Sequence, residues 1–100
     1  MHRKIFLIMP NADYSFDLSK FHNYINNLYS KGYFYSWWHY LPGGLYFVDT
    51  HLDVNQIYNL LITHMPRRYL IIMEVNPHNQ QGWLPQEAWN WFNERKNLLY

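Results

Sequence analysis

The chain has 100 residues, of which 49% are hydrophobic, 21% aromatic and only 15% charged. This length predicts a single domain over residues 1–100, with a modest core and more apolar surface than that core can bury. The absence of cysteine excludes disulfides, thiolate zinc sites and cysteine nucleophiles. The formal net charge of +1 gives a monomer only a weak electrostatic footprint for nucleic-acid binding, although a dimer would double any basic patch.

Neither secretion nor membrane insertion is predicted. The apolar run Ile5–Met9 follows basic residues, but it is far shorter than the core of a signal peptide and Pro10 ends it. No stretch approaches the roughly 18 to 20 apolar residues that cross a bilayer. We therefore expect a cytoplasmic protein with no membrane partner.

The first predicted elements are a strand and a helix. Residues 3–9 are apolar at both alternating positions and are closed by Pro10, which is typical of a short strand. The next apolar side chains recur at helical spacing: Leu18, Phe21, Ile25, Leu28 and Tyr29. Ser15 and Asp17 are candidate N-caps of this helix, and Gly32 is its predicted end.

An aromatic hairpin follows. Residues 33–40, YFYSWWHY, and residues 45–49 are predicted strands, because the Leu41-Pro42-Gly43-Gly44 segment between them has the composition of a turn. A strand with one face in water alternates apolar and polar residues, whereas both alternating sets are aromatic here. Such a strand is expected to be buried on both sides.

The second half of the chain predicts a helix, a strand and a helix. Residues 53–65 carry apolar side chains on one helical face, and Pro66 lies just beyond their end. Residues 67–75, RRYLIIMEV, form the fourth predicted strand. The segment 82–96 contains Pro85, suited to a first helical turn, and ends in basic residues that suit a helix C-terminus.

This order predicts an α+β fold of the ferredoxin-like β-α-β-β-α-β type. Its four-stranded antiparallel sheet carries two helices on one face, and a C-terminal helix is added. The strands are apolar toward the second face as well. The last helix can cover part of that face, and a twofold-symmetric homodimer is the simplest cover for the remainder.

The segments YSWWHYL, RYLIIMEV and GWLPQEAWNWF resemble the small bacterial proteins of the SinR family. These belong with the ferredoxin-like group that includes the small CRISPR adaptation nuclease and the virulence-associated VapD ribonucleases. The resemblance extends from about Ile5 to Arg95, and it implies a homodimer built by packing or extending sheets.

The chain departs from this group at the residue that matters for nuclease activity. Members of this group typically have a sequence similar to Tyr-Asp-Leu at the end of the first strand. The resemblance implies that this aspartate binds a metal ion and lies near its symmetry mate in the dimer. Here the strand ends Ile8-Met9-Pro10. Asp13 and Asp17 replace that carboxylate only if the following loop folds back, and then a pair of them would hold Mg²⁺ or Mn²⁺ and activate water. Otherwise no cofactor is expected.

Five ring-bearing residues of the hairpin are candidates for core or dimer packing: Tyr35, Trp37, Trp38, His39 and Tyr46. Rings on ferredoxin-like sheets also stack on bases, but such platforms need adjacent basic residues and residues 33–49 contain neither Arg nor Lys. Packing is therefore the favoured interpretation. Arg67 and Arg68, at the start of the fourth strand, are the best candidates for phosphate contacts.

Two catalytic or metal-binding patterns are disfavoured. The six histidines are scattered along the chain without the close paired spacing of a zinc motif, and His64 is expected to be a core or boundary residue. Ser36, His39 and Asp49 lie on paired strands, but Ser36 and His39 are expected to point to opposite faces and so to form no triad.

The sequence is compatible with three functions. The favoured one is a small homodimeric, non-catalytic binding protein of a nuclease-like fold, acting on RNA, DNA or protein in defence or mobile-element biology. The second is a metal-dependent endoribonuclease that uses Asp13 or Asp17. The third is an inhibitor or antitoxin of a toxin–antitoxin pair.

Overall fold

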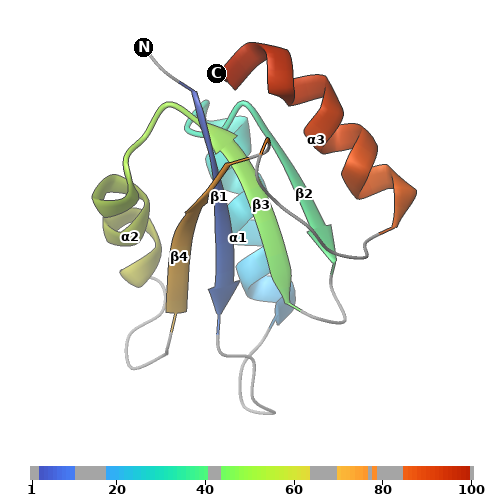
Figure 1. Cartoon of the computed structure of the whole chain (residues 1–100). Coiled ribbons are helices and arrows are strands. Elements are labelled where there is room, and N and C mark those ends of the chain that lie inside the picture. The colour runs from blue at the N-terminus through green and yellow to red at the C-terminus, as the bar shows by residue number, and fades with distance from the viewer. Residues whose placement is uncertain are drawn as a thin grey trace.

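The computed structural model describes residues 3–10, 18–40, 44–63, 70–76, 78 and 85–99. Its elements follow the predicted order (Figure 1): β1 (Lys4–Pro10), α1 (Leu18–Ser30), β2 (Ser36–Tyr40), β3 (Leu45–Thr50), α2 (Val54–Ile62), β4 (Leu70–Val75) and α3 (Gln86–Leu99). The predicted α+β class is therefore confirmed. None of the helices in the described part of the chain is long and apolar enough to cross a membrane.

The four strands form one antiparallel sheet in the order β2-β3-β1-β4. In the register of this sheet, Leu7 lies opposite Phe47 on one side and Met73 on the other, and Phe47 lies opposite Trp38. Side chains on one strand alternate between faces, so these four residues share one face. Strands β2 and β4 are the two edges of the sheet.

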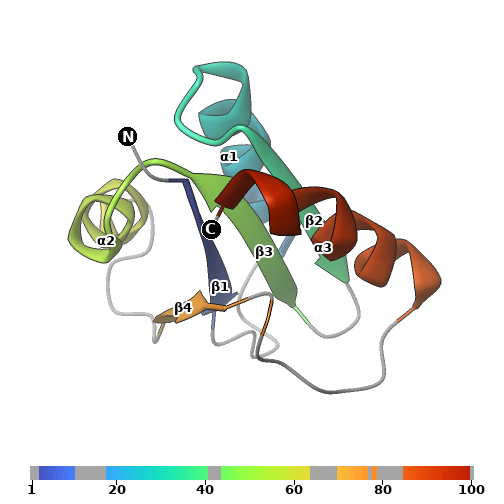
Figure 2. The ribbon, with the colours of Figure 1, turned by 45° about the horizontal axis from the view of Figure 1, so that its top comes forward.

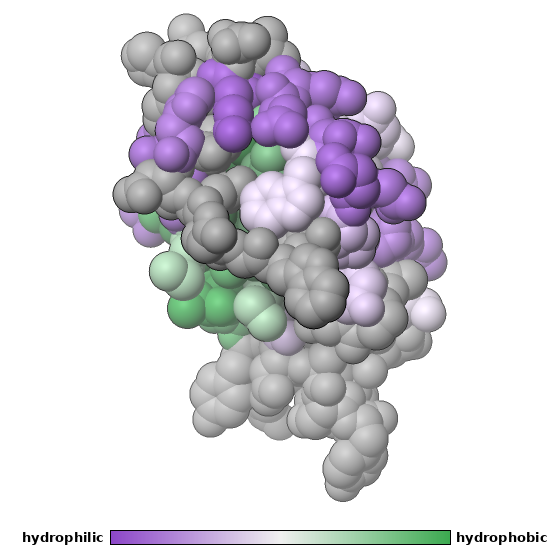
Figure 3. Space-filling model, turned by 45° about the vertical axis from the view of Figure 1, so that its right-hand side comes forward, coloured by the Kyte–Doolittle hydropathy of each residue, from purple (hydrophilic) through white to green (hydrophobic). Residues whose placement is uncertain are grey.

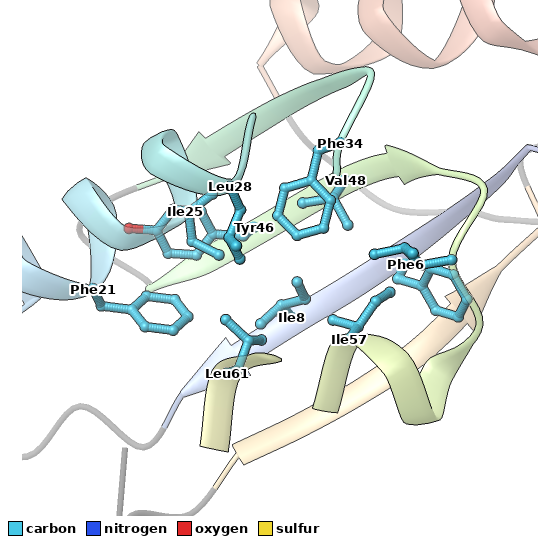
Figure 4. Packing of buried hydrophobic residues seen from close by; sticks show 11 residues of the cluster. Phe6, Ile8, Phe21, Ile25, Leu28, Phe34, Tyr46, Val48, Ile57 and Leu61 are labelled. Carbon is cyan, nitrogen blue, oxygen red and sulfur yellow. The ribbon is translucent and has the colours of Figure 1, made fainter. Parts of the chain in front are cut away.

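Helices α1 and α2 cover the first face of the sheet (Figure 1). The buried residues of this core come from both helices, from the strands and from the segments before β2 and before α2: Phe6, Ile8, Phe21, Ile25, Leu28, Phe34, Tyr46, Val48, Leu52, Ile57 and Leu61. Figure 4 shows most of these side chains converging between the helices and the sheet. Their spacing on α1 and α2 is the helical periodicity that predicted both helices.

Helix α3 lies across the opposite face, over β2 and β3 (Figure 2). A second core forms beneath it from four buried residues: Ile5, Phe47, Trp91 and Phe92. Leu7, Trp38, Leu45 and Val75 pack against this cluster from the strands. The additional C-terminal helix thus completes a three-layer arrangement in which the sheet is the middle layer.

Local signals set the helix boundaries. Asp53 caps α2 by accepting a hydrogen bond from Gln56 N (2.8 Å), while the Gln56 side chain accepts one from Asp53 N (2.9 Å), which is a capping box. Helix α1 ends before Gly32, whose φ is +87°. Tyr33 N donates to Leu28 O across this turn (3.0 Å), so β2 begins at Ser36 and not at Tyr33 as predicted.

Candidate functional site

The position of α3 on the sheet is fixed by a buried carboxylate on β3. Asp49 is fully buried, and its Oδ2 lies 3.2 Å from Nε of Arg95 on α3. Arg3, just before β1, donates from Nε to Asp49 Oδ1 at 3.0 Å and also pairs with Oδ2 through Nη2. The side-chain hydrogen bond with Asp49 raises the pKa of Arg3. One carboxylate therefore joins the N-terminal strand, β3 and the last helix.

Ring contacts complete this attachment. Trp91 Nε1 donates to Ser36 Oγ at 3.0 Å, and the Arg95 guanidinium lies 4.3 Å from the centre of a Trp91 ring. Phe92 packs edge-on against Phe47 with ring centroids 4.8 Å apart. All these contacts lie on the β2 and β3 side of the second face, so α3 covers that half of the sheet.

On β1 and β4 the second face is buried at Ile5, but other side chains of these two strands are exposed beside α3. Met9, Ile71 and Met73 have exposed fractions of 39%, 50% and 52%, and Leu7 between them is partly buried. Ile71 lies opposite Met9 and Met73 opposite Leu7 in the register, so the four side chains adjoin one another. In the space-filling view, a hydrophobic area (green) lies on the same side of the molecule as a larger hydrophilic area (purple) (Figure 3). We call these four residues the open apolar patch.

A group of rings on the first face joins α1 to the hairpin. The rings of His22 on α1 and His39 on β2 have centroids 4.6 Å apart, and Trp37 lies 5.0 Å from His22 and 5.1 Å from His39. Tyr46 Oη lies 3.4 Å from His22 Nδ1. Burial, together with the charge of nearby His22, lowers the pKa of His39, whereas burial raises the pKa of Tyr46 to about 12.

This histidine pair is a feature that the sequence analysis missed. The scatter of histidines along the chain argued against any site, but the fold brings His22 and His39 together. Within the described residues no group of three or more His, Cys, Asp or Glu side chains is placed to hold a metal ion. The only sequence signal for the pair was the position of His22 next to Phe21 on the predicted buried side of the first helix.

The predicted aromatic residues divide between the two faces. Tyr46 is fully buried in the first core, and Trp37 and His39 stack along it on the same face. Trp38 points to the second face and stacks on Phe47 with centroids 6.2 Å apart. Tyr35 is 45% exposed, with the Arg3 guanidinium 4.5 Å from its ring centre. Helix α3 of the same chain therefore covers Trp38 and the second face of the sheet at β2.

Ser36, His39 and Asp49 form no catalytic triad. The Ser36 hydroxyl accepts from Trp91 on the α3 side of the sheet, while His39 stacks with Trp37 and Tyr46 on the opposite side. Asp13, Asp17, His64, Arg67 and Arg68 lie outside the described residues. The nuclease alternative and the phosphate contacts therefore stay predictions.

Comparison with family models, with curated proteins and with solved structures finds no match to this chain. The resemblance to the SinR family consequently remains a prediction from the sequence, and the chemistry of the described surfaces is the basis for any function.

Proposed function

We propose that the protein is a small homodimeric, non-catalytic binding protein of ferredoxin-like fold. The order β2-β3-β1-β4 supports this fold, because β3 separates the strands of the first β-α-β unit and β1 separates those of the second. The observation that carries the proposed dimer is the open apolar patch, which combines exposed Met9, Ile71 and Met73 with an edge strand. Contiguous apolar surface of this kind marks interaction sites.

A second copy of the chain is the occupant that β4 favours. Exposed edge strands usually carry charges or proline that prevent pairing with another strand, but Glu74 is the only charged residue in Leu70–Val75. Glu74 lies opposite Phe6 and so belongs to the first face, whereas Ile71 and Met73 belong to the second. Antiparallel pairing of β4 with its symmetry mate would join two open apolar patches around a twofold axis.

The dimer is tested by measuring molar mass at micromolar concentration by light scattering. The chain has a mass of 12.4 kDa, and we expect twice this value for the unaltered protein. The double variant Ile71→Glu/Met73→Glu should give the single-chain mass, because two charges would be buried at the interface. Tyr58→Glu, which changes an exposed ring on α2, is the matched control and should remain dimeric. A single-chain mass for the unaltered protein would refute the proposal.

The binding partner is tested separately. Labelled single- and double-stranded RNA and DNA are incubated with the protein in Mg²⁺ or Mn²⁺ and again in chelator, and both retention and cleavage are followed. Retention without cleavage supports a nucleic-acid-binding protein, and the absence of both directs the search to a protein partner. Cleavage abolished by chelator, and by Asp13→Ala or Asp17→Ala, would replace this proposal with a metal-dependent ribonuclease.

A further inference from the structure

The ring group on the first face contains two imidazole side chains that could act as metal ligands. The proposed binding function does not use them. His22 comes from α1 and His39 from the edge strand β2, and both side chains are partly exposed. Their ring centroids are 4.6 Å apart with an angle of 77° between the planes. Aromatic packing alone allows this arrangement, but two imidazoles in contact at the surface are also the donor set that transition metals prefer.

The separation of the rings matches two imidazoles that share one ion. With metal–nitrogen distances of about 2.1 Å, the ring centroids lie about 4.5 Å apart at the roughly 90° angle of a square-planar or tetragonal Ni²⁺ or Cu²⁺ site, and about 5 Å apart at the wider angle of a tetrahedral Zn²⁺ site. The observed separation falls in this range without any movement of α1 relative to β2. The packing of α1 on the sheet thus already holds the two rings at a spacing that one shared ion requires.

Tyr46 provides the orientation that a metal-binding histidine needs. Its hydroxyl lies 3.4 Å from His22 Nδ1, and Figure 4 shows the hydroxyl on the α1 side of the core. In the tautomer with the proton on His22 Nδ1, this N–H donates a hydrogen bond to Tyr46 Oη. The lone pair of His22 Nε2 is then available to a metal ion.

We propose that His22 and His39 form a binding site for a divalent transition-metal ion, with Zn²⁺, Ni²⁺ and Cu²⁺ as the class of ligand. Imidazole nitrogens suit these three ions, whereas Mg²⁺ and Ca²⁺ require oxygen donors. Because two histidines leave coordination positions open, water or a group from a bound molecule completes the shell. An ion held in this way ties α1 to the edge of the sheet, and it does so independently of the open apolar patch.

The test measures Zn²⁺ binding by calorimetry, with the full chain free of any histidine tag. All samples carry His2→Gln, so that this histidine does not contribute. We expect saturable binding of a single ion per chain. Either His22→Gln or His39→Gln should weaken binding by about tenfold or more, as expected for loss of a ligand. His78→Gln, at an exposed histidine that contacts Lys96 O (3.2 Å), is the matched control and should bind unchanged.

A spectroscopic measurement tests for the two histidine ligands without requiring that His22→Gln or His39→Gln folds. Cu²⁺ bound to the His2→Gln protein should give an electron paramagnetic resonance spectrum with two equatorial imidazole nitrogens. The proposal is overturned if no Zn²⁺ binding is detected, if both ligand variants bind as tightly as the control, or if the Cu²⁺ spectrum contains fewer than two imidazole nitrogens.

Discussion

Arg95 and Asp49 form an ion pair, with 3.2 Å between Arg95 Nε and Asp49 Oδ2, that joins the last helix to a central strand of the sheet. The Asp49 side chain is completely buried and that of Arg95 is only 12% exposed. Since buried charges are strongly unfavourable without partners, α3 must keep the position in which Arg95 reaches Asp49. This position places α3 over β2 and β3, beside the open apolar patch.

Replacing Asp49 by Asn should destabilise the protein. The amide has nearly the shape of the carboxylate but leaves Arg3 and Arg95 without a counter-charge, and breaking such a buried pair costs about 3 kcal/mol. The free energy of unfolding, measured with urea, should fall by about this amount. Glu94→Gln is the control, because the Glu94 side chain is 72% exposed and its pairing with Arg95 contributes little. Equal stability of the two variants would contradict the anchoring role.

The end of α1 gives a prediction about backbone conformation. Gly32 has a φ of +87°, and a Cβ added there would meet nothing within 4 Å. The cost of Gly32→Ala is therefore conformational and should be about 1 to 2 kcal/mol of unfolding free energy. Gly32→Asn should cost less, because asparagine tolerates the left-handed region better. Thermal and urea unfolding of both variants test this, and an alanine variant as stable as the asparagine one would argue against it.

The pH dependence of stability should include a contribution from His39. Its pKa in the folded protein is lowered from the ordinary value of 6.5, by burial first and by His22 second. As the pH falls through about 6.5, the unfolded chain binds a proton at this residue before the folded chain does. The unfolding free energy should therefore decrease as the pH falls through about 6.5, since protons favour the unfolded state in this range.

The His39→Gln variant should have a smaller slope of unfolding free energy against pH over this range. Among the described residues, the rings that face His39 are those of His22, Trp37 and Tyr46. His78→Gln should keep the slope of the unaltered protein, because His78 lies on the surface outside this group. A slope that His39→Gln leaves unchanged would assign the effect to other groups.

Much of this fold follows from local patterns, whereas the sites depend on contacts between distant residues. Helical spacing in α1 and α2 and apolar runs in β1 and β4 predict the order of elements, because each pattern lies within one element. Asp49 looked like the end of a strand, and nothing local indicated that Arg3 and Arg95, each 46 residues away, would neutralise it. Likewise, His22 and His39 adjoin only because α1 packs beside the edge strand.

The two tryptophans of β2 should each contribute to stability, from opposite faces. Trp37 stacks on Tyr46 in the first core, and Trp38 stacks on Phe47 in the second (centroids 6.1 and 6.2 Å apart). Both rings are partly buried. Trp37→Ala and Trp38→Ala should therefore each lower the unfolding free energy by about 2 kcal/mol, less than the 3 to 5 kcal/mol of a fully buried ring.

The control for these variants is Tyr40→Ala on the same strand, because the Tyr40 side chain is 47% exposed. Urea unfolding should rank this variant closest to the unaltered protein. If either tryptophan variant were as stable as Tyr40→Ala, its ring would not be packed and would be available for stacking on bases. That outcome would favour a nucleic acid as the partner over a protein, because exposed rings on such a sheet are the stacking surface that single-stranded nucleic acids use.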